Sequence, residues 1–230
     1  MPENAVDTEL DWRDGNVPVS RRYGDLYYSA EDGLAETRYV FLDGNDLAER
    51  WPESEGFAIG ELGFGTGLGF LAAWERWRGL AAPGAVLRHT SFEIAPLDPA
   101  QMARALARWR ELSELSAELL SVWRGGGLLT LPGAELQVVV GDARETLPRW
   151  AGTADAWFLD GFAPSRNPEL WEAPLLTAVF ERTNPGGSCA TYSAAGQVRR
   201  DLAAAGFRVF KRPGFGTKRD MTIGRRPAES

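Results

Sequence analysis

Short hydrophobic runs alternate with longer stretches of helical periodicity along most of the chain, beginning at Phe57. Runs of this length, bounded by turn residues, are typical of buried strands, and their alternation with helices is typical of β-α-β units. The pattern predicts seven strands, near residues 57–62, 87–93, 136–140, 155–160, 187–193, 207–211 and 220–224. We therefore expect an α/β fold with a seven-stranded, mostly parallel sheet and helices on both faces.

Helical periodicity fills the intervals between these strands. The first helix begins near Gly67, and its apolar residues have the spacing of a face packed against a sheet: Phe70, Leu71, Trp74 and Trp77. A second helical stretch opens at Asp98 or Pro99 and continues toward Trp123, after which three glycines end it. Further helices are expected over 143–150, 168–182 and 195–205. We expect most of the nine tryptophans to pack in the core.

The first 50 residues follow a different pattern. Two strand-like runs, 25–29 and 37–42, are separated by a turn-like segment. We expect residues 1–50 to form an N-terminal β extension packed on a main domain, residues 51–230. No internal repeat or low-complexity linker divides the chain, so one structural domain is expected overall.

Composition excludes several kinds of site. The 230 residues include one cysteine, Cys189, and one histidine, His89, which are too few for a structural disulfide or a Cys/His zinc site. We expect no metal centre, a buried Cys189 and a His89 that fills a strand or loop. The sequence has no secretory signal and no run of 18 apolar residues, so we expect a cytoplasmic protein without a membrane partner.

The net charge of −7 argues weakly against nucleic-acid binding, because phosphates require local positive potential. Residues 199–226, however, contain nine basic and two acidic side chains. A basic patch and an ordinary solvated surface explain this segment equally well on charge alone.

A glycine-rich segment, Glu61-Leu-Gly63-Phe-Gly65-Thr-Gly67-Leu-Gly69, joins the first core strand to the first helix. Glycines allow a tight turn and let a ligand approach the unpaired N–H groups at the start of a helix. The dinucleotide pattern G-x-G-x-x-G would need glycine where Leu68 stands, which disfavours a nicotinamide oxidoreductase. The pattern acidic-x-Gly-x-Gly-x-Gly resembles the loop of Rossmann-like methyltransferases that bind S-adenosylmethionine.

Acidic residues follow three of the predicted strands. We expect Glu61 to face the cationic amino-acid end of that ligand, Glu93 to accept the ribose hydroxyls, and Asp142 to lie near the adenine. Each acid alone is more typical of a helix cap or a loop, and the combination with the glycines favours a cofactor site. The predicted cofactor-binding residues are Glu61, Gly63, Gly65, Gly67, Glu93, Asp142 and Ala143.

The fourth core strand leads into Asp160-Gly-Phe162-Ala-Pro164, which brings Asp160 to the carboxyl edge of the sheet. An alkyl amine in water is mostly protonated and attacks a methyl group only with a free lone pair. A neighbouring carboxylate holds the ammonium and accepts its proton, so Asp160 is the candidate catalytic residue. Phe162 is a candidate for a cation–π contact with the reacting centre. Their structural alternatives are a turn residue and a core side chain.

Several blocks of sequence together resemble the methyltransferase domain of the MnmC family, which also exists as the stand-alone enzyme MnmD. The resemblance covers the chain from about Asp11 to Gly224. The blocks are residues 18–20, 27–29, 33–41 with 44–45, 61–67, 156–164 with 167–168, and 213–216 with 218–219. The resemblance implies a Rossmann-like class I methyltransferase fold and S-adenosylmethionine-dependent methylation of the 5-aminomethyl group of wobble uridine in tRNA, often 2-thiolated.

The resemblance also implies roles for individual residues. Asp160 would lie near the acceptor amine, and Tyr28 and Asn45 would border the same pocket, although turn and strand positions explain these two almost as well. Lys218 and Arg219 are expected to contact phosphates around the anticodon loop. Two positions depart from the family pattern: Gly69 replaces the usual asparagine, and Ile94 a common lysine.

The fused members of the family carry a flavin-dependent oxidase domain, which this sequence does not resemble. We therefore expect a stand-alone enzyme or an excised domain, with a separate FAD-dependent oxidase acting upstream. Two alternatives remain open: a class I methyltransferase acting on a small-molecule or protein amine, and a non-catalytic module that binds S-adenosylmethionine or RNA. The intact run around Asp160 argues against the second.

Overall fold

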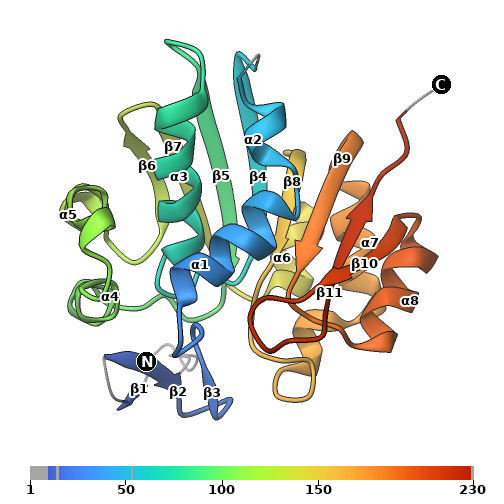
Figure 1. Cartoon of the computed structure of the whole chain (residues 1–230), viewed down its shortest axis with the longest axis horizontal. Helices are drawn as coiled ribbons and strands as arrows, with labels where there is room; N and C mark the ends of the chain where they lie inside the picture. Colours follow the sequence, from blue (N-terminus) through green and yellow to red (C-terminus); the bar gives the residue numbers. More distant parts are fainter. Residues whose placement is uncertain (1–9, 14–15, 53, 229–230) are drawn as a thin grey trace.

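The computed structural model describes residues 10–13, 16–52 and 54–228. In this part of the chain, one large sheet has eight strands in the order β10-β11-β9-β8-β4-β5-β7-β6 (Figure 1). The strands are β4 (Gly56–Leu62), β5 (Val86–Glu93), β6 (Gly127–Leu131), β7 (Ala134–Val140), β8 (Ala154–Leu159), β9 (Thr183–Thr191), β10 (Arg208–Pro213) and β11 (Asp220–Arg225).

The five central strands, from β9 to β7, are parallel to one another, and the strands at the two edges run antiparallel to their neighbours. The predicted fold class is confirmed, but the count of seven strands is wrong. The additional strand, β6, pairs antiparallel with β7 in the region where the sequence suggested only a glycine break. This edge strand is mostly exposed, with Leu128 68% accessible, so it lacks the buried run that identified the other strands.

Helices cover both faces of the sheet, as predicted (Figure 1). One face carries α3 (Leu68–Leu80), α4 (Pro99–Leu106) and α5 (Ser113–Val122), and the other α6 (Ala143–Arg149), α7 (Ala173–Glu181) and α8 (Gly196–Ala205). Most of the tryptophans are buried in these layers, which confirms the packing prediction: Trp51, Trp74, Trp77, Trp109, Trp123, Trp157 and Trp171.

Two long predicted helices are interrupted. The stretch from Pro99 to Trp123 is divided into α4, the short turn η2 (Arg110–Leu112) and α5, because Trp109 has an extended backbone and packs its ring on Tyr28, 4.7 Å between centroids. The stretch 168–182 is divided into η3 (Pro168–Trp171) and α7 by the extended Glu172. Neither break could be predicted from the sequence, since hydrophobic residues continue at helical spacing through both.

The N-terminal region is only partly β. Strands β1 (Leu10–Arg13), β2 (Val17–Ser20) and β3 (Asp25–Leu26) form a small antiparallel sheet, at the bottom of Figure 1. The predicted strand at 37–42 is wrong: the chain there forms α1 (Gly33–Thr37) and the π-helical η1 (Arg38–Asp43), followed by α2 (Leu47–Arg50). A short apolar run fits a buried helix as well as a strand. Residues 1–9 and 14–15 of the predicted extension, and 229–230 of the main domain, lie outside the described residues.

The strand order reverses direction at the centre of the sheet. From β4 the chain builds outward to β5 and β7, and it then returns to add β8 and β9 on the opposite side of β4. In doubly wound folds, the loops that leave the strands at such a point diverge and open a crevice for ligands. The loops after β4 and β8 approach each other closely: a Cβ placed on Gly63 would lie 3.2 Å from the Asp160 carbonyl oxygen. None of the described helices is long and apolar enough to span a bilayer.

Candidate functional site

A cavity of about 640 Å³ opens at the carboxyl edge of the sheet. Its wall is formed by the turns after the parallel strands, residues 63–66, 92–95, 141–144 and 160–163, together with Tyr192 after β9. Residues 25–31, Glu36 of α1 and the β10–β11 loop close the remaining sides. The volume is in the range of small-molecule sites, and the cavity lies where the strand order predicts a ligand.

The glycine loop forms one end of this cavity. Gly63, Gly65 and Gly67 have φ of 83°, 52° and 80°, a left-handed region that side chains with a Cβ rarely adopt. Gly63 and Gly65 line the cavity, and a Cβ on Gly65 would lie 3.1 Å from the Tyr27 ring. Gly67 does not line it; this residue precedes α3 and packs against Phe64. The three glycines therefore shape the loop, and two of them leave its backbone open to a ligand.

Glu93 lies at the end of β5 with its carboxylate held in place. Its Oε2 accepts from the Gly65 N–H at 3.0 Å, and its Oε1 accepts from the Ala95 N–H at 2.8 Å. Burial raises the pKa of Glu93, and these backbone bonds oppose the rise. Glu93 lines the cavity, and a carboxylate has acceptor capacity beyond these two bonds, which suits a pair of adjacent hydroxyls.

Asp142 caps the N-terminus of α6 and also faces the cavity with Ala143. Its carboxylate accepts from the Arg144 backbone N–H at 2.9 Å and from the Arg144 guanidinium at 2.6–3.1 Å. The hydrogen bonds from Arg144 lower the pKa of Asp142. Arg144 also lines the cavity, but the sequence analysis did not predict it. Its position two residues after Asp142 could have indicated this role.

Glu61 is not on the cavity wall, which corrects its predicted contact with the cofactor. Its carboxylate is buried, and Oε2 lies 3.0 Å from His89 Nε2 in the neighbouring strand. Its Oε1 lies where a Cβ of residue 69 would be, so the departure to Gly69 makes room for this carboxylate. His89 is thus the buried partner of Glu61 rather than simple filling.

Asp160 follows β8 and lines the cavity, as predicted. Its Oδ1 accepts from the Gly161 N–H at 2.8 Å, and the Tyr192 hydroxyl donates to the Gly161 carbonyl at 2.5 Å. Burial and the nearby charge of Glu61 raise the pKa of Asp160 to about 8. A carboxyl group with this pKa exchanges a proton readily near neutral pH.

Aromatic rings form the wall beside Asp160. Phe162 lies 4.7 Å from the Tyr23 ring and 5.0 Å from the Tyr27 ring, measured between centroids, and all three residues line the cavity. Tyr28 also borders it, but its hydroxyl lies 2.9 Å from the Ala105 carbonyl oxygen and is therefore engaged with the backbone. Tyr23 and Tyr27 were missed, although Tyr27 belongs to one of the sequence blocks that carry the resemblance.

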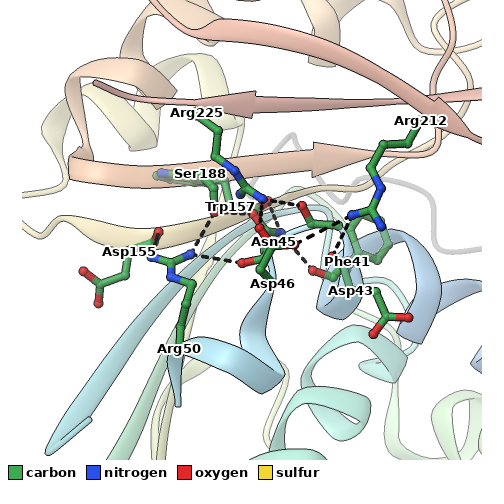
Figure 2. Close-up of polar contacts among 11 residues, drawn as sticks. Phe41, Asp43, Asn45, Asp46, Arg50, Asp155, Trp157, Ser188, Arg212 and Arg225 are labelled. Carbon is green, nitrogen blue, oxygen red and sulfur yellow. Dashed lines mark hydrogen bonds and ion pairs between the residues drawn. The ribbon is translucent and has the colours of Figure 1, made fainter. Parts of the chain in front are cut away.

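Asn45 is fully buried away from the cavity, so the prediction that it borders the acceptor pocket is wrong. Its Nδ2 donates to the carbonyls of Phe41 at 2.9 Å and Trp157 at 3.3 Å, and its Oδ1 accepts from Ser188 Oγ at 2.6 Å. Figure 2 shows these contacts beside the guanidinium of Arg50, which donates to Ser188 Oγ at 2.9 Å. Asn45 therefore joins the N-terminal helices to the central strands.

Lys218 and Arg219 are adjacent in sequence but differ in surroundings. Lys218 Nζ lies 2.6 Å from Glu36 Oε1, and the Lys218 side chain lines the cavity. Arg219 is exposed and does not line the cavity, and no side-chain partner is recorded for it in the described part of the chain. Both side chains are exposed, but Lys218 is paired with Glu36 at the cavity, so Arg219 is the better placed of the two for a phosphate contact.

Comparisons with known proteins agree with this geometry. Residues 110–227, about half of the chain, match a family described as S-adenosyl-L-methionine-dependent methyltransferase. The tRNA 5-methylaminomethyl-2-thiouridine biosynthesis bifunctional protein MnmC of Caulobacter vibrioides is 49% identical over 224 residues, which are 95% of this chain and 38% of that protein. MnmC of Chromobacterium violaceum is 46% identical, over 94% of this chain and 34% of that protein.

Among solved structures, the crystal structure of MnmC2 from Aquifex aeolicus superposes with a TM-score of 0.78 at 26% identity, covering 100% of this chain and 74% of that one. The resemblance found in the sequence is confirmed. The chain spans little more than a third of the length of the curated relatives.

Proposed function

Because the chain belongs to a family of S-adenosyl-L-methionine-dependent methyltransferases, we propose that it methylates the 5-aminomethyl group of wobble uridine in tRNA, with or without 2-thiolation, to 5-methylaminomethyl. The observation that carries the proposal is the 49% identity to an MnmC protein over 95% of the chain. The cavity supports it, since a carboxyl group with a pKa of about 8 faces the region where an amine would react.

The residues of the cavity fit S-adenosylmethionine. Glu93 offers two fixed carboxylate oxygens to a ribose, Asp142 and Ala143 border the adjoining space, and Gly63 and Gly65 leave their backbone accessible. When bound, S-adenosylmethionine supplies an electrophilic methyl group on a cationic sulfur. The negative charge of Glu61 beneath the loop favours this cation without touching it.

Asp160 has the role of proton acceptor in this proposal. The acceptor reaches the cavity as an alkyl ammonium, whose nitrogen has no free lone pair until one proton leaves. The Asp160 carboxylate takes that proton, and the ammonium next to it lowers the pKa of the carboxyl group until the transfer. The ring of Phe162 borders the same space and stabilises positive charge by a cation–π contact of about 0.5–2 kcal/mol.

The partner in this proposal is the anticodon loop of tRNA, which must present one splayed base to the cavity. Basic residues of the 199–226 segment, among them the half-buried Arg199 and the exposed Arg200 and Arg219, supply positive potential for phosphates. The acceptor's aminomethyl group would come from an upstream FAD-dependent oxidase, separate from this chain or joined to it. A cytoplasmic location follows from the same substrate.

Nucleoside mass spectrometry tests the proposal. Unfractionated tRNA bearing 5-aminomethyluridine is incubated with the protein and S-adenosylmethionine, and digested nucleosides gain one methyl group at that base. Asp160→Asn lowers the rate roughly 100-fold or more, and a panel of small amines and bulk protein serves as the comparison. Methylation of the panel but not of tRNA would establish the alternative acceptor class, and unaltered turnover in Asp160→Asn would remove the assigned base.

A further inference from the structure

The ammonium group of Lys218 occupies a defined position inside the cavity. Its Nζ lies 2.6 Å from Glu36 Oε1 and 4.6 Å from the centre of the Tyr192 ring. Glu36 comes from α1, Tyr192 follows β9, and Lys218 belongs to the β10–β11 loop, so three distant segments meet at one cation. An ion pair combined with a ring face is a built receptor for a primary ammonium.

Glu36 and Tyr192, which contact the ammonium group, are held more firmly than the Lys218 side chain. The Glu36 side chain is only 13% exposed, whereas that of Lys218 is 45% exposed. Tyr192 has a fixed ring, because its hydroxyl donates to the carbonyl of Gly161, the residue after Asp160. Glu36 and Tyr192 therefore keep their geometry if the lysine side chain moves away.

The same position is within electrostatic reach of the proposed base. After burial and the charge of Glu61, the charge of Glu36 further raises the pKa of Asp160, and the charge of Lys218 lowers it. All four residues, Asp160, Glu36, Tyr192 and Lys218, line one cavity. A primary ammonium bound to Glu36 thus shares the cavity with the carboxyl group that would take its proton and is electrostatically coupled to it.

We propose that Glu36 and the ring face of Tyr192 bind the primary ammonium of the acceptor, and that the Lys218 side chain is an internal mimic of this group that the acceptor displaces. The inference rests on the proposed function, since the 5-aminomethyl group and the lysine side chain end in the same CH₂–NH₃⁺ unit. It makes Glu36 and Tyr192 specificity residues for cationic amines, and it gives Lys218 a role other than a phosphate contact.

Steady-state kinetics with aminomethyl-bearing tRNA separate the two roles of Lys218. Glu36→Gln raises the KM for tRNA at least tenfold while the Kd for S-adenosylmethionine stays unchanged, which also shows that the variant is folded. Lys218→Met lowers this KM or leaves it unchanged, because an internal competitor is removed. Lys211→Met removes the same charge from the same basic segment but outside the cavity, where Lys211 pairs with Asp220, and it therefore measures how much loss of positive charge alone raises the KM. An unchanged KM in Glu36→Gln, or a raised KM in Lys218→Met, overturns the inference.

A binding experiment tests the receptor without methyl transfer. Lys211 and Lys218 are the only lysines in the sequence, so reductive ¹³C-methylation gives two resolved lysine signals in NMR spectra. Titration with n-butylammonium chloride shifts the Lys218 signal and leaves that of Lys211 in place, and Glu36→Gln abolishes the shift. If the Lys218 signal does not respond, the ammonium site is refuted even when the nucleoside assay supports tRNA methylation. A response without tRNA methylation retains the site and refutes the proposed acceptor.

Discussion

Three carboxyl groups at the carboxyl edge of the sheet have different protonation behaviour because their neighbours differ. Hydrogen bonds from Arg144 lower the pKa of Asp142, whereas burial raises the pKa values of Glu93 and Asp160. Glu93 is additionally held by two backbone N–H groups, which suits a binding role. Asp160 accepts a hydrogen bond from the Gly161 N–H and has the pKa of about 8 that suits proton transfer.

Because of this raised pKa, ionisation of Asp160 lowers the free energy of unfolding as the pH increases. The folded-state pKa of about 8 exceeds the unfolded value near 3.8, so its stabilising contribution is complete below pH 4 and is lost as the pH rises through 8. Asp160→Asn does not titrate, and its free energy of unfolding relative to the wild type therefore increases between pH 5.5 and pH 9. We expect a gain of about 3 kcal/mol, or roughly 6–12 °C in Tm, from calorimetry at the two pH values.

Methyl transfer is measured with the same variant, and its rate is expected to fall roughly 100-fold or more. A difference in Tm that does not grow with pH would show that Asp160 is already ionised at neutral pH, and the assigned proton acceptor would then lack its tuned pKa.

At the level of elements, the turn between β4 and α3 depends on backbone conformation more than on side-chain chemistry. Gly63, Gly65 and Gly67 all have positive φ, and Gly63 and Gly65 pack closely on Asp160 and Tyr27 of other segments. The loop can therefore serve a ligand only while its left-handed geometry is retained.

Gly65→Ala tests this dependence. The new Cβ would meet the Tyr27 ring at 3.1 Å in a left-handed conformation with φ of 52°, which costs about 1–2 kcal/mol. We expect Tm to fall by roughly 2–8 °C and the Kd for S-adenosylmethionine to rise, as measured by calorimetry. Gly79→Ala in α3 is the control, because a Cβ there meets no atom within 4 Å and raises helix stability by about 0.5–1 kcal/mol. Equal effects of the two changes would contradict a special loop geometry.

In the whole molecule, the N-terminal helices are part of the main core rather than an attachment to it. Val40, Phe41, Leu42 and Leu47 pack in the same hydrophobic cluster as the residues of α3. Polar contacts then fix η1 and α2 to the sheet, since Arg50 donates to the Asp155 carbonyl at 2.9 Å (Figure 2). Glu36 and the other cavity residues of this region are therefore positioned by long-range packing.

Asn45→Ala measures this connection. The change removes donors to two carbonyls and the acceptor of Ser188 Oγ, all buried, at a cost of about 2–3 kcal/mol. We expect Tm to fall by roughly 4–12 °C, while the KM for tRNA, measured well below Tm, stays unchanged. A raised KM with an unaltered Tm would instead restore Asn45 to the substrate site.

The sequence by itself determined the layer architecture and the edge of the sheet at which the chemistry lies. Buried strands leave continuous apolar runs, and the carboxyl ends of parallel strands share one edge, so Glu93, Asp142 and Asp160 were correctly expected together with the glycine loop. Elements without such a signal were missed or misassigned, as for the exposed β6 and the helical 37–42 run.

Only the tertiary structure decided which way individual side chains point and which distant segments meet. Glu61 ends its strand as expected, but a buried histidine across the sheet and the missing Cβ of Gly69 turn its carboxylate away from the cavity. The pairing of Lys218 with Glu36 joins residues 182 positions apart, and no local pattern encodes it. Such contacts depend on the packing of the whole core, because a side chain's direction follows from neighbours that the chain brings together only on folding.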